Sequence, residues 1–418
     1  MIRSTVRFAI FTCVCACGAA SNPVSSAESR PRTTAPAPHA SDPPAGAGAG
    51  TTAAAASVPL VPSPIDNADP VPVRRPQHPE RPFPYREEEV AISVLAAPHD
   101  PASTEHIALA GTLTLPAGKG PFPAVVFITG SGPQDRDETL FGHKPFLVLS
   151  DALTRRGIAT LRIDDRGVGK STGSPDVGTT LDFAEDVGSE LAWLAARPEI
   201  DKRALGVVGH SEGGLIAPIV AAGSARARFI VMLAGTGMPG AQILSAQLAL
   251  IARAAGEPET KIECDRVDAG RMFARLIATR TDAELDAALR AFVDADPPHR
   301  AQREALTARI QQQRAWMRTF LALDPVPYLE KVRVPVLAIA GDHDLQVPKE
   351  NLPLIDAALH RGKSPDITTR LIPGVNHLFQ HTQTGAPSEY GSLEETFAPE
   401  AIQLVTSWIV DRTARLRR

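Results

Sequence analysis

Short apolar runs alternate with helix-like segments along most of this 418-residue chain, and the alternation limits the folds open to it. From about residue 88 onward, the apolar runs have the length and side-chain content of strands. They read EVAISVLA, IALAGTLTL, FPAVVFITG, IATLRID, ALGVVG, RFIVMLAG, VPVLAIAGD and TTRLIPG. Segments with helical spacing lie between or after them, at 145–156, 181–196, 211–222 and 398–416. This pattern predicts an α/β fold, in which helices cover both faces of a mostly parallel sheet.

The alternation breaks between residues 236 and 331. This segment is rich in Ala, Leu, Arg and Gln, and it contains no strand-like run. It lies between two predicted strands, so we expect a helical cap inserted into the sheet domain. Ligands bind at the carboxyl edge of open α/β sheets, and the cap is expected over that edge. The predicted α/β core therefore comprises residues 88–235 and 332–418.

The N-terminal part of the chain differs in composition from the rest. Residues 1–20 combine two arginines, a short apolar stretch and small residues, which is typical of a signal peptide. The signal peptide could be processed in two ways. One is lipidation at Cys17, whose surroundings resemble a bacterial lipoprotein motif, and the other is simple cleavage near Ala20 or Ala27. Residues 21–87 are rich in Pro, Ala and Gly, and they predict a disordered linker. We expect an exported protein, either periplasmic, attached to a membrane through a lipid on the cell surface, or secreted.

Charge and cysteine spacing argue against several classes of function. The 43 basic and 47 acidic residues give a net charge of −4, so no nucleic-acid partner is expected. Beyond the N-terminal segment the only cysteine is Cys264, so we expect no structural disulfide. No group of His, Cys and carboxylate residues has metal-ligand spacing. Lys170 and Ser171 lack the first glycine of a phosphate-binding loop. We therefore expect neither a metal nor a cofactor.

The stretch LGVVGHSEGGLIAP joins a predicted buried strand to a predicted helix. A G-x-S-x-G pattern in this context predicts a sharp turn that projects the hydroxyl of Ser211 above the sheet. Gly209 and Gly213 would keep neighbouring atoms clear of the turn. The amide of Glu212 would lie at the helix N-terminus, where the helix dipole favours an oxyanion. We therefore predict that Ser211 is a nucleophile and not a structural turn residue.

A serine nucleophile needs a general base and an acid that orients the base. On a sheet of this kind the expected chain order is serine, acid, histidine. His377 follows the last predicted strand and is the candidate base, with His381 as the second choice. The candidate acids are Asp342 and Asp344, which stand on one loop, and spacing alone does not choose between them.

Four motifs follow one another in the chain: GSGPQDRDE, DDRGVGKSTG, GHSEGG and GDHDLQVP. With these motifs, residues 88–416 resemble the α/β-hydrolase superfamily, and most closely its secreted bacterial esterase-like serine hydrolases. In that family the acid is the aspartate three positions after the loop glycine, in the pattern G-x-x-D-x-x-V-P. Starting from Gly341, the resemblance implies Asp344 as the acid. It also matches Asn376 and His377 to the Asn-His pair of the family.

The resemblance further implies a second donor for the oxyanion. In relatives this is the backbone amide two residues after a histidine, in a His-Gly-x motif, and here that amide belongs to Ser131. Thr129 stands where relatives have the histidine. Because the donor is a backbone amide, threonine in place of histidine at position 129 should leave the oxyanion hole intact.

Two charge-rich stretches are expected at the rim of the site. Gln134, Asp135 and Arg136 are predicted either to shape the pocket or to contact the substrate. The residues of the other stretch are expected to hold the loops in place through carboxylate, amide and guanidinium contacts. They are Asp164, Asp165 and Arg166.

Together these features predict a serine hydrolase that cleaves small-molecule carboxylic esters through an acyl-enzyme intermediate. A peptidase of the aminopeptidase kind and an acyl thioesterase are alternatives on the same fold, because a Ser-His-Asp triad does not define the scissile bond. A third alternative is a surface binding protein that keeps the fold without catalysis. The intact order of serine, acid and histidine argues against it.

Overall fold

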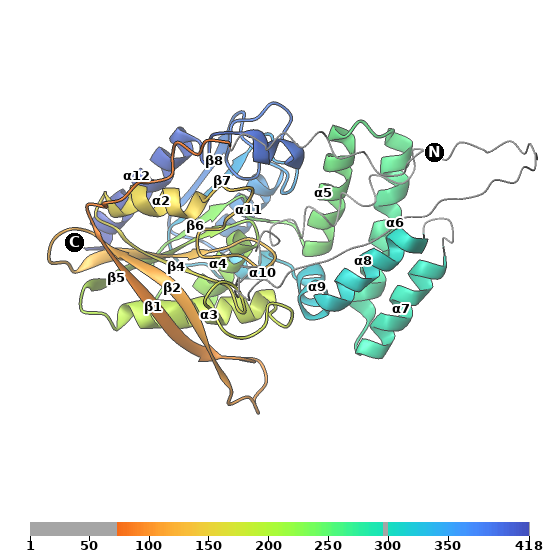
Figure 1. The fold of residues 1–418 in the computed structure, drawn as a ribbon, viewed down its shortest axis with the longest axis horizontal. Helices are drawn as coiled ribbons and strands as arrows, with labels where there is room; N and C mark the ends of the chain where they lie inside the picture. Colours follow the sequence, from red (N-terminus) through yellow and green to blue (C-terminus); the bar gives the residue numbers. More distant parts are fainter. Residues whose placement is uncertain (1–72, 296–299, 418) are drawn as a thin grey trace, which may run out of the picture. The chain divides into compact units, whose positions relative to one another are not determined.

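The computed structural model describes residues 73–295 and 300–417. An eight-stranded sheet, in the order β1-β2-β4-β3-β5-β6-β7-β8, forms the centre of the domain (Figure 1). Strands β3 to β8 run parallel, whereas β1 pairs antiparallel with β2, and β2 pairs antiparallel with β4. The strands are β1 (Arg86–Leu95), β2 (His106–Leu115), β3 (Phe122–Ile128), β4 (Ala159–Ile163), β5 (Ile200–His210), β6 (Ile230–Leu233), β7 (Val336–Gly341) and β8 (Ile367–Ile372). The fold is the α/β-hydrolase fold, as the sequence predicts.

Helices cover both faces of this sheet. One face packs against α2 (Pro145–Thr154) and α12 (Pro399–Leu416). The other face packs against α3 (Thr180–Ala195), α4 (Glu212–Gly223), α10 (Val326–Leu329) and α11 (Asn351–Arg361). Neighbouring strand residues such as Val207 and Val208 are fully buried on opposite faces. Because side chains alternate along a strand, burial on both faces explains why the strands are almost continuously apolar.

In the described residues, five helices lie between β6 and α10, the short helix that precedes β7 (Figure 1). They are α5 (Gly240–Ala254), α6 (Glu259–Ala278), α7 (Asp282–Asp294), α8 (Arg300–Gln312) and α9 (Arg314–Ala322). These helices, which we call the cap, share an apolar core that includes Phe273 and Met317, and Leu215 of α4 joins it. The predicted cap, residues 236–331, extends too far, because Leu329 of α10 is fully buried in the core of the sheet domain.

The predicted linker, residues 21–87, also extends too far. The described chain begins within it, and β1 starts at Arg86. Gln77 donates from Nε2 to the carbonyl oxygen of Phe397 at 2.6 Å, and its Oε1 accepts from the amide of Thr396 at 2.6 Å. The composition of this stretch suggested disorder. However, an extended chain needs little apolar content when its polar groups bond to a folded surface.

The remaining N-terminal predictions lie outside the described residues. They are the signal peptide at 1–20, its lipidation site Cys17, and the linker up to residue 72. Within 73–295 and 300–417, no helix is both long enough and apolar enough to cross a membrane. Cys264 in the cap is an exposed free thiol. Export and lipid attachment therefore stay predictions.

Candidate active site

Ser211 stands at the turn between β5 and α4, with φ 55° and ψ −114°. A non-glycine residue with positive φ is strained, and such residues cluster at functional sites. The turn also brings backbone atoms very close together. A Cβ atom on Gly209 would collide with the carbonyl of Gly213, and a Cβ atom on Gly213 would collide with the carbonyl of Ile128. The turn therefore requires glycine at both positions.

His377 lies in the loop after β8, and its ring contacts a carboxylate. Its Nδ1 atom is 2.8 Å from Oδ2 of Asp344, and both side chains are buried. Oδ1 of Asp344 accepts from the amides of Gln346 and Val347, each at 2.8 Å. These bonds hold the carboxylate in place. With the proton on Nδ1, a neutral His377 has an unprotonated Nε2, which is the tautomer that a general base needs.

The alternative acid and the alternative base have other roles. Oδ1 of Asp342 accepts from the amide of Gly374 at 2.6 Å, and this bond connects the loop after β7 to the turn after β8. His381 is half-exposed, and its ring pairs with Glu395 and Glu400, each at 2.9 Å. Neither Asp342 nor His381 lines the cavity that contains the serine.

Ser131, Ser211 and His377 line one cavity with a volume of about 50 Å³. Its walls come from the loops after β3, β6, β7 and β8, the end of β5, the start of α4, and cap helices α5 and α9. The apolar lining comprises Leu140, Ile243, Leu244, Phe320, Val347 and Leu378. Further polar side chains are Gln134, Glu138, His210, Thr236, Gln247 and Gln346. The exposed surface of the cavity is mostly apolar, although several polar side chains converge on it, and this combination is typical of a small-molecule site.

Of the three predicted pocket residues, only Gln134 lines this cavity. Asp135 and Arg136 do not line it, so of the two expected roles only shaping the pocket fits their positions. The carboxylate of Asp135 accepts from two amides of its own turn, and the guanidinium of Arg136 donates to both oxygens of Asp164, at 3.0 and 2.8 Å. Arg136 also donates to Glu89 on β1, so both charged side chains hold the loop in place and do not enter the cavity.

Two backbone amides beside the cavity are without acceptors. They belong to Ser131 and Glu212, and no hydrogen bond of the described residues uses either amide. The amide of Gly130, by contrast, donates to Oε1 of Glu138 at 2.7 Å. The hydroxyl of Thr129, at the position where relatives carry histidine, donates to Oδ1 of Asp165 at 2.8 Å and so fixes the loop. This arrangement leaves two donors that an oxyanion can use.

The side chain of Glu212 joins the cap to the loop after β3. Its carboxylate accepts from Oγ1 of Thr180 at 2.6 Å, and its two oxygens lie 2.8 and 2.9 Å from Nε1 of Trp316 on α9. The side chain of Ser131 also bonds to it. Burial raises the pKa of Glu212, and these donors oppose the rise. The residue that supplies one oxyanion amide therefore also anchors the cap.

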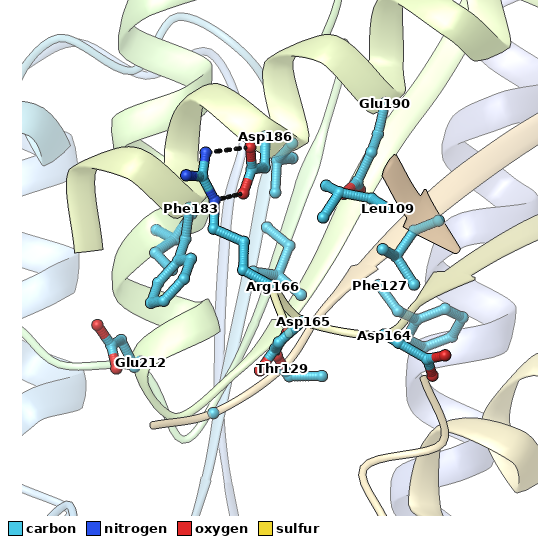
Figure 2. Close-up of a pocket in the computed structure, with 15 residues that line it drawn as sticks. Leu109, Phe127, Thr129, Asp164, Asp165, Arg166, Phe183, Asp186, Glu190 and Glu212 are labelled. Atoms are coloured by element: carbon cyan, nitrogen blue, oxygen red, sulfur yellow. Dashed lines mark hydrogen bonds and ion pairs between the residues drawn. The ribbon is translucent and has the colours of Figure 1, made fainter. Parts of the chain in front are cut away.

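A second cavity, of about 40 Å³, borders the loop after β3 (Figure 2). Burial raises the pKa values of Asp165 and Glu190, which line it, well above their usual values. Arg166 donates to both oxygens of Asp186, at 2.6 and 2.7 Å. Asp165 and Arg166 therefore support loops and helix α3, in agreement with the sequence prediction. Despite these acids, no group of three or more His, Cys, Asp or Glu side chains in the described residues is placed to hold a metal ion.

Sequence reasoning missed a buried pair beside Ser211. Nδ1 of His210 is 2.9 Å from Oε1 of Glu138, and Nε2 of His210 is 2.9 Å from the carbonyl oxygen of His377. Both residues belong to quoted motifs, GHSEGG and GSGPQDRDE, and this is the only signal that could have drawn attention to them. They are separated by 72 positions, and no local pattern connects them.

Comparisons with known proteins identify a relative of similar sequence and several solved structures of similar fold. Esterase EstD of Thermotoga maritima is 34% identical over 140 residues, which span 34% of this chain and 33% of EstD. The match thus covers about a third of that relative. Similar solved structures include the α/β hydrolase GrgF from Penicillium sp. sh18, with a TM-score of 0.49, 14% identity, and coverage of 78% of this chain and 99% of GrgF. A Pyrococcus furiosus esterase has a TM-score of 0.47 and 14% identity, with coverage of 79% of this chain and 91% of that protein.

A family model also matches most of the described domain. Residues 105–378 match the model of the X-Pro dipeptidyl-peptidases, family S15. The matched segment extends from the start of β2 to just past His377, and it includes the cap. The chain therefore belongs to the X-Pro dipeptidyl-peptidase (S15) family, within the α/β hydrolases.

Proposed function

We propose that this protein is a serine esterase that cleaves small carboxylic esters through an acyl-enzyme intermediate. One observation carries the proposal: a strained serine, a buried His377–Asp344 pair and two unpaired backbone amides meet at one cavity. These are the groups that acyl transfer needs, namely a nucleophile, an oriented base and oxyanion donors. The esterase name of the relative EstD agrees with this proposal.

The reaction proceeds in two steps. The hydroxyl of Ser211 attacks the ester carbonyl carbon while Nε2 of His377 takes its proton. The amides of Ser131 and Glu212 donate to the oxyanion of the tetrahedral intermediate. His377 then returns the proton to the leaving alcohol, and the acyl-enzyme forms. A water molecule attacks this ester by the same route and releases the carboxylic acid together with free Ser211.

The size of the cavity supports short acyl groups. Its volume of about 50 Å³ is far below the roughly 300–1,000 Å³ of pockets for drug-sized ligands. Ile243 and Leu244 of α5 and Phe320 of α9 bound it from the cap side. A long acyl chain would have to displace these helices. We therefore expect kcat/KM to fall steadily from acetyl to octanoyl esters of one phenol, and a rise with chain length would contradict this assignment.

Ser211→Ala tests the mechanism directly. Without the hydroxyl, kcat on phenyl acetate should fall by about 10⁴–10⁶-fold. A matched control is Ser189→Ala, because the Ser189 hydroxyl on α3 bonds only to the carbonyl of Glu185 among the described residues. A fluorophosphonate probe should label the wild type and the control but not Ser211→Ala. Retention of most activity by Ser211→Ala would reject the esterase mechanism, and absence of labelling in the wild type would favour a non-catalytic binding protein.

Peptide hydrolysis is a second candidate function. The family takes its name from peptidases. In addition, Oε1 of Gln134 and Oε2 of Glu138 are buried acceptors without a partner among the described residues, and both side chains line the cavity. A substrate with N–H groups could donate to them. Kinetics on X-Pro anilides and on phenyl acetate compare the two functions, and faster turnover of the anilides would favour the peptidase.

A further inference from the structure

The Glu138–His210 pair takes no part in the proton transfers described above, yet it contacts three parts of the site. Oε1 of Glu138 lies 2.9 Å from Nδ1 of His210 and accepts from the amide of Gly130 at 2.7 Å. Nε2 of His210 lies 2.9 Å from the carbonyl oxygen of His377. Gly130 directly precedes the second oxyanion donor, and His210 directly precedes the nucleophile. One carboxylate and one ring therefore connect the oxyanion loop, the nucleophile turn and the loop of the base.

The partners of His210 determine its charge. A carboxylate oxygen and a carbonyl oxygen are both acceptors only. A neutral imidazole carries one N–H group, so one of these two acceptors would then point at a ring lone pair. We propose that His210 is an imidazolium ion, that Glu138 is its counter-ion, and that this buried ion pair positions His377 and the oxyanion loop around Ser211. The proposal rests on the esterase function stated above and adds positioning residues to it.

The surroundings of the pair are consistent with this charge state. The side chains of His210 and Glu138 are only 6% and 1% exposed. Burial alone would lower the pKa of His210, but the Glu138 carboxylate, the carbonyl of His377 and the charge of Asp344 raise it above its usual value. The ring of His377 is the other titratable group against His210, with the ring centroids 4.8 Å apart. Glu138 has a φ of 52°, a strained conformation that the surrounding contacts hold.

Glu138→Gln tests the pair because an amide cannot make both bonds of Oε1. An amide oxygen in that place would accept from Gly130, but it would no longer supply the negative charge that favours an imidazolium. An amide nitrogen would instead direct its hydrogens at the N–H of Gly130. We expect kcat on phenyl acetate to fall by about 10–100-fold, since small misplacements of reacting groups have effects of this size. KM should stay within about threefold, because the pair is expected to act on catalysis and not on uniform binding.

The matched control is Glu395→Gln, which also removes the carboxylate of a His–Glu pair. His381 and Glu395 are 2.9 Å apart, but they are partly exposed and do not line the cavity. This variant should keep the wild-type kcat. Equal kcat values for Glu138→Gln and Glu395→Gln would overturn the positioning role of Glu138.

The pH dependence of the loss distinguishes a charged pair from a purely structural contact. Without its counter-ion, His210 should bind its second proton only at lower pH. The ratio of kcat for Glu138→Gln to kcat for the wild type should therefore rise as the pH falls. A ratio that is constant between pH 5 and pH 9 would overturn the ion pair.

Side-chain ¹⁵N NMR of the histidine-labelled wild-type protein tests the charge of His210 without any substrate. His210→Asn identifies the signals of this ring by their loss. We expect protonation of both ring nitrogens at pH 7, with titration above the usual value near 6.5. A neutral His210 at pH 7 would overturn the proposal even if every variant at Glu138 failed to fold. Two protonated nitrogens in a protein that hydrolyses no ester would support the ion pair and reject the esterase function instead.

Discussion

At the scale of single residues, two aspartates on one loop have different partners. Asp344 bonds to the ring of His377 at 2.8 Å, whereas Asp342 bonds to the amide of Gly374 at 2.6 Å. Both are carboxylates two positions apart, so spacing alone could not separate them. Their roles follow from which loop each one meets at the carboxyl edge of the sheet.

Substitution by asparagine should separate the two aspartates in activity. In Asp344→Asn the side-chain amide of asparagine can donate to Nδ1 of His377. This bond favours the tautomer that carries its proton on Nε2. In that tautomer, Nε2 cannot accept the proton of the serine hydroxyl. We expect a fall of about 10⁴-fold in kcat on phenyl acetate. For Asp342→Asn, kcat should fall by less than about tenfold, since an asparagine oxygen can still accept from the amide of Gly374. Losses of equal size would contradict the assignment of Asp344 as the acid.

At the scale of secondary-structure elements, the cap and the sheet domain share a buried polar contact. Trp316 of α9 donates to the carboxylate of Glu212 at the start of α4, and its ring stacks on Phe320 with centroids 4.9 Å apart. Glu212 follows the nucleophile directly. A shift of α9 would therefore reach the N-terminus of α4, where one oxyanion donor lies.

Trp316→Phe should weaken this connection and keep the aromatic stack. Loss of one hydrogen bond to a charged group should lower the free energy of unfolding by about 1.5–3 kcal/mol. Because the carboxylate beside the oxyanion amide loses a donor, kcat should fall as well. Trp193→Phe is the matched control, since Trp193 lies on α3 and its ring contacts Arg197. Urea unfolding and kcat on phenyl acetate measure both effects, and equal results for the two variants would argue against the role of Trp316.

At the scale of the whole molecule, several acids are buried together in the domain. Burial raises the pKa values of Asp165, Glu190 and Glu212. A carboxyl whose pKa is higher in the folded than in the unfolded protein favours folding most below its unfolded pKa. Its contribution is lost as the pH rises toward the folded pKa. These groups therefore lower the free energy of unfolding as the pH increases above their usual pKa values, 3.8 for Asp165 and 4.5 for Glu190 and Glu212.

Glu190→Gln should remove the loss of stability that the buried Glu190 carboxyl causes as the pH rises. Oε2 of Glu190 has no hydrogen-bond partner among the described residues, so few contacts are lost. The free energy of unfolding of the variant, relative to the wild type, should increase with pH above about 4.5, by up to about 1.4 kcal/mol per pH unit. Glu185→Gln, at an exposed position on the same helix, is the control. Urea unfolding between pH 4 and pH 8 measures the difference, and a difference independent of pH would show that the pKa of Glu190 is not raised.

Much of the fold was predictable because its signals are local. Strand-like runs, helical spacing and the G-x-S-x-G turn each depend on residues that are close in the chain, and they indicated the parallel sheet and the turn at Ser211. The errors also have local causes. Proline-rich composition extended the linker to residue 87, although Gln77 bonds to the folded domain. Charge left two roles open for Asp135 and Arg136, shaping the pocket or contacting the substrate, and only their bonds to neighbouring loops and strands favour the first.

By itself, the sequence determined the α/β architecture, the strained turn at Ser211 and the candidate base His377, because strand, helix and turn preferences act over a few residues. Only the tertiary structure decided the partners of these groups. It placed His210 between Glu138 and the loop of His377, and Trp316 against Glu212. The physical reason is that buried charges and hydrogen-bonding groups must be paired, and their partners come from whichever distant segments the packed sheet and cap bring together.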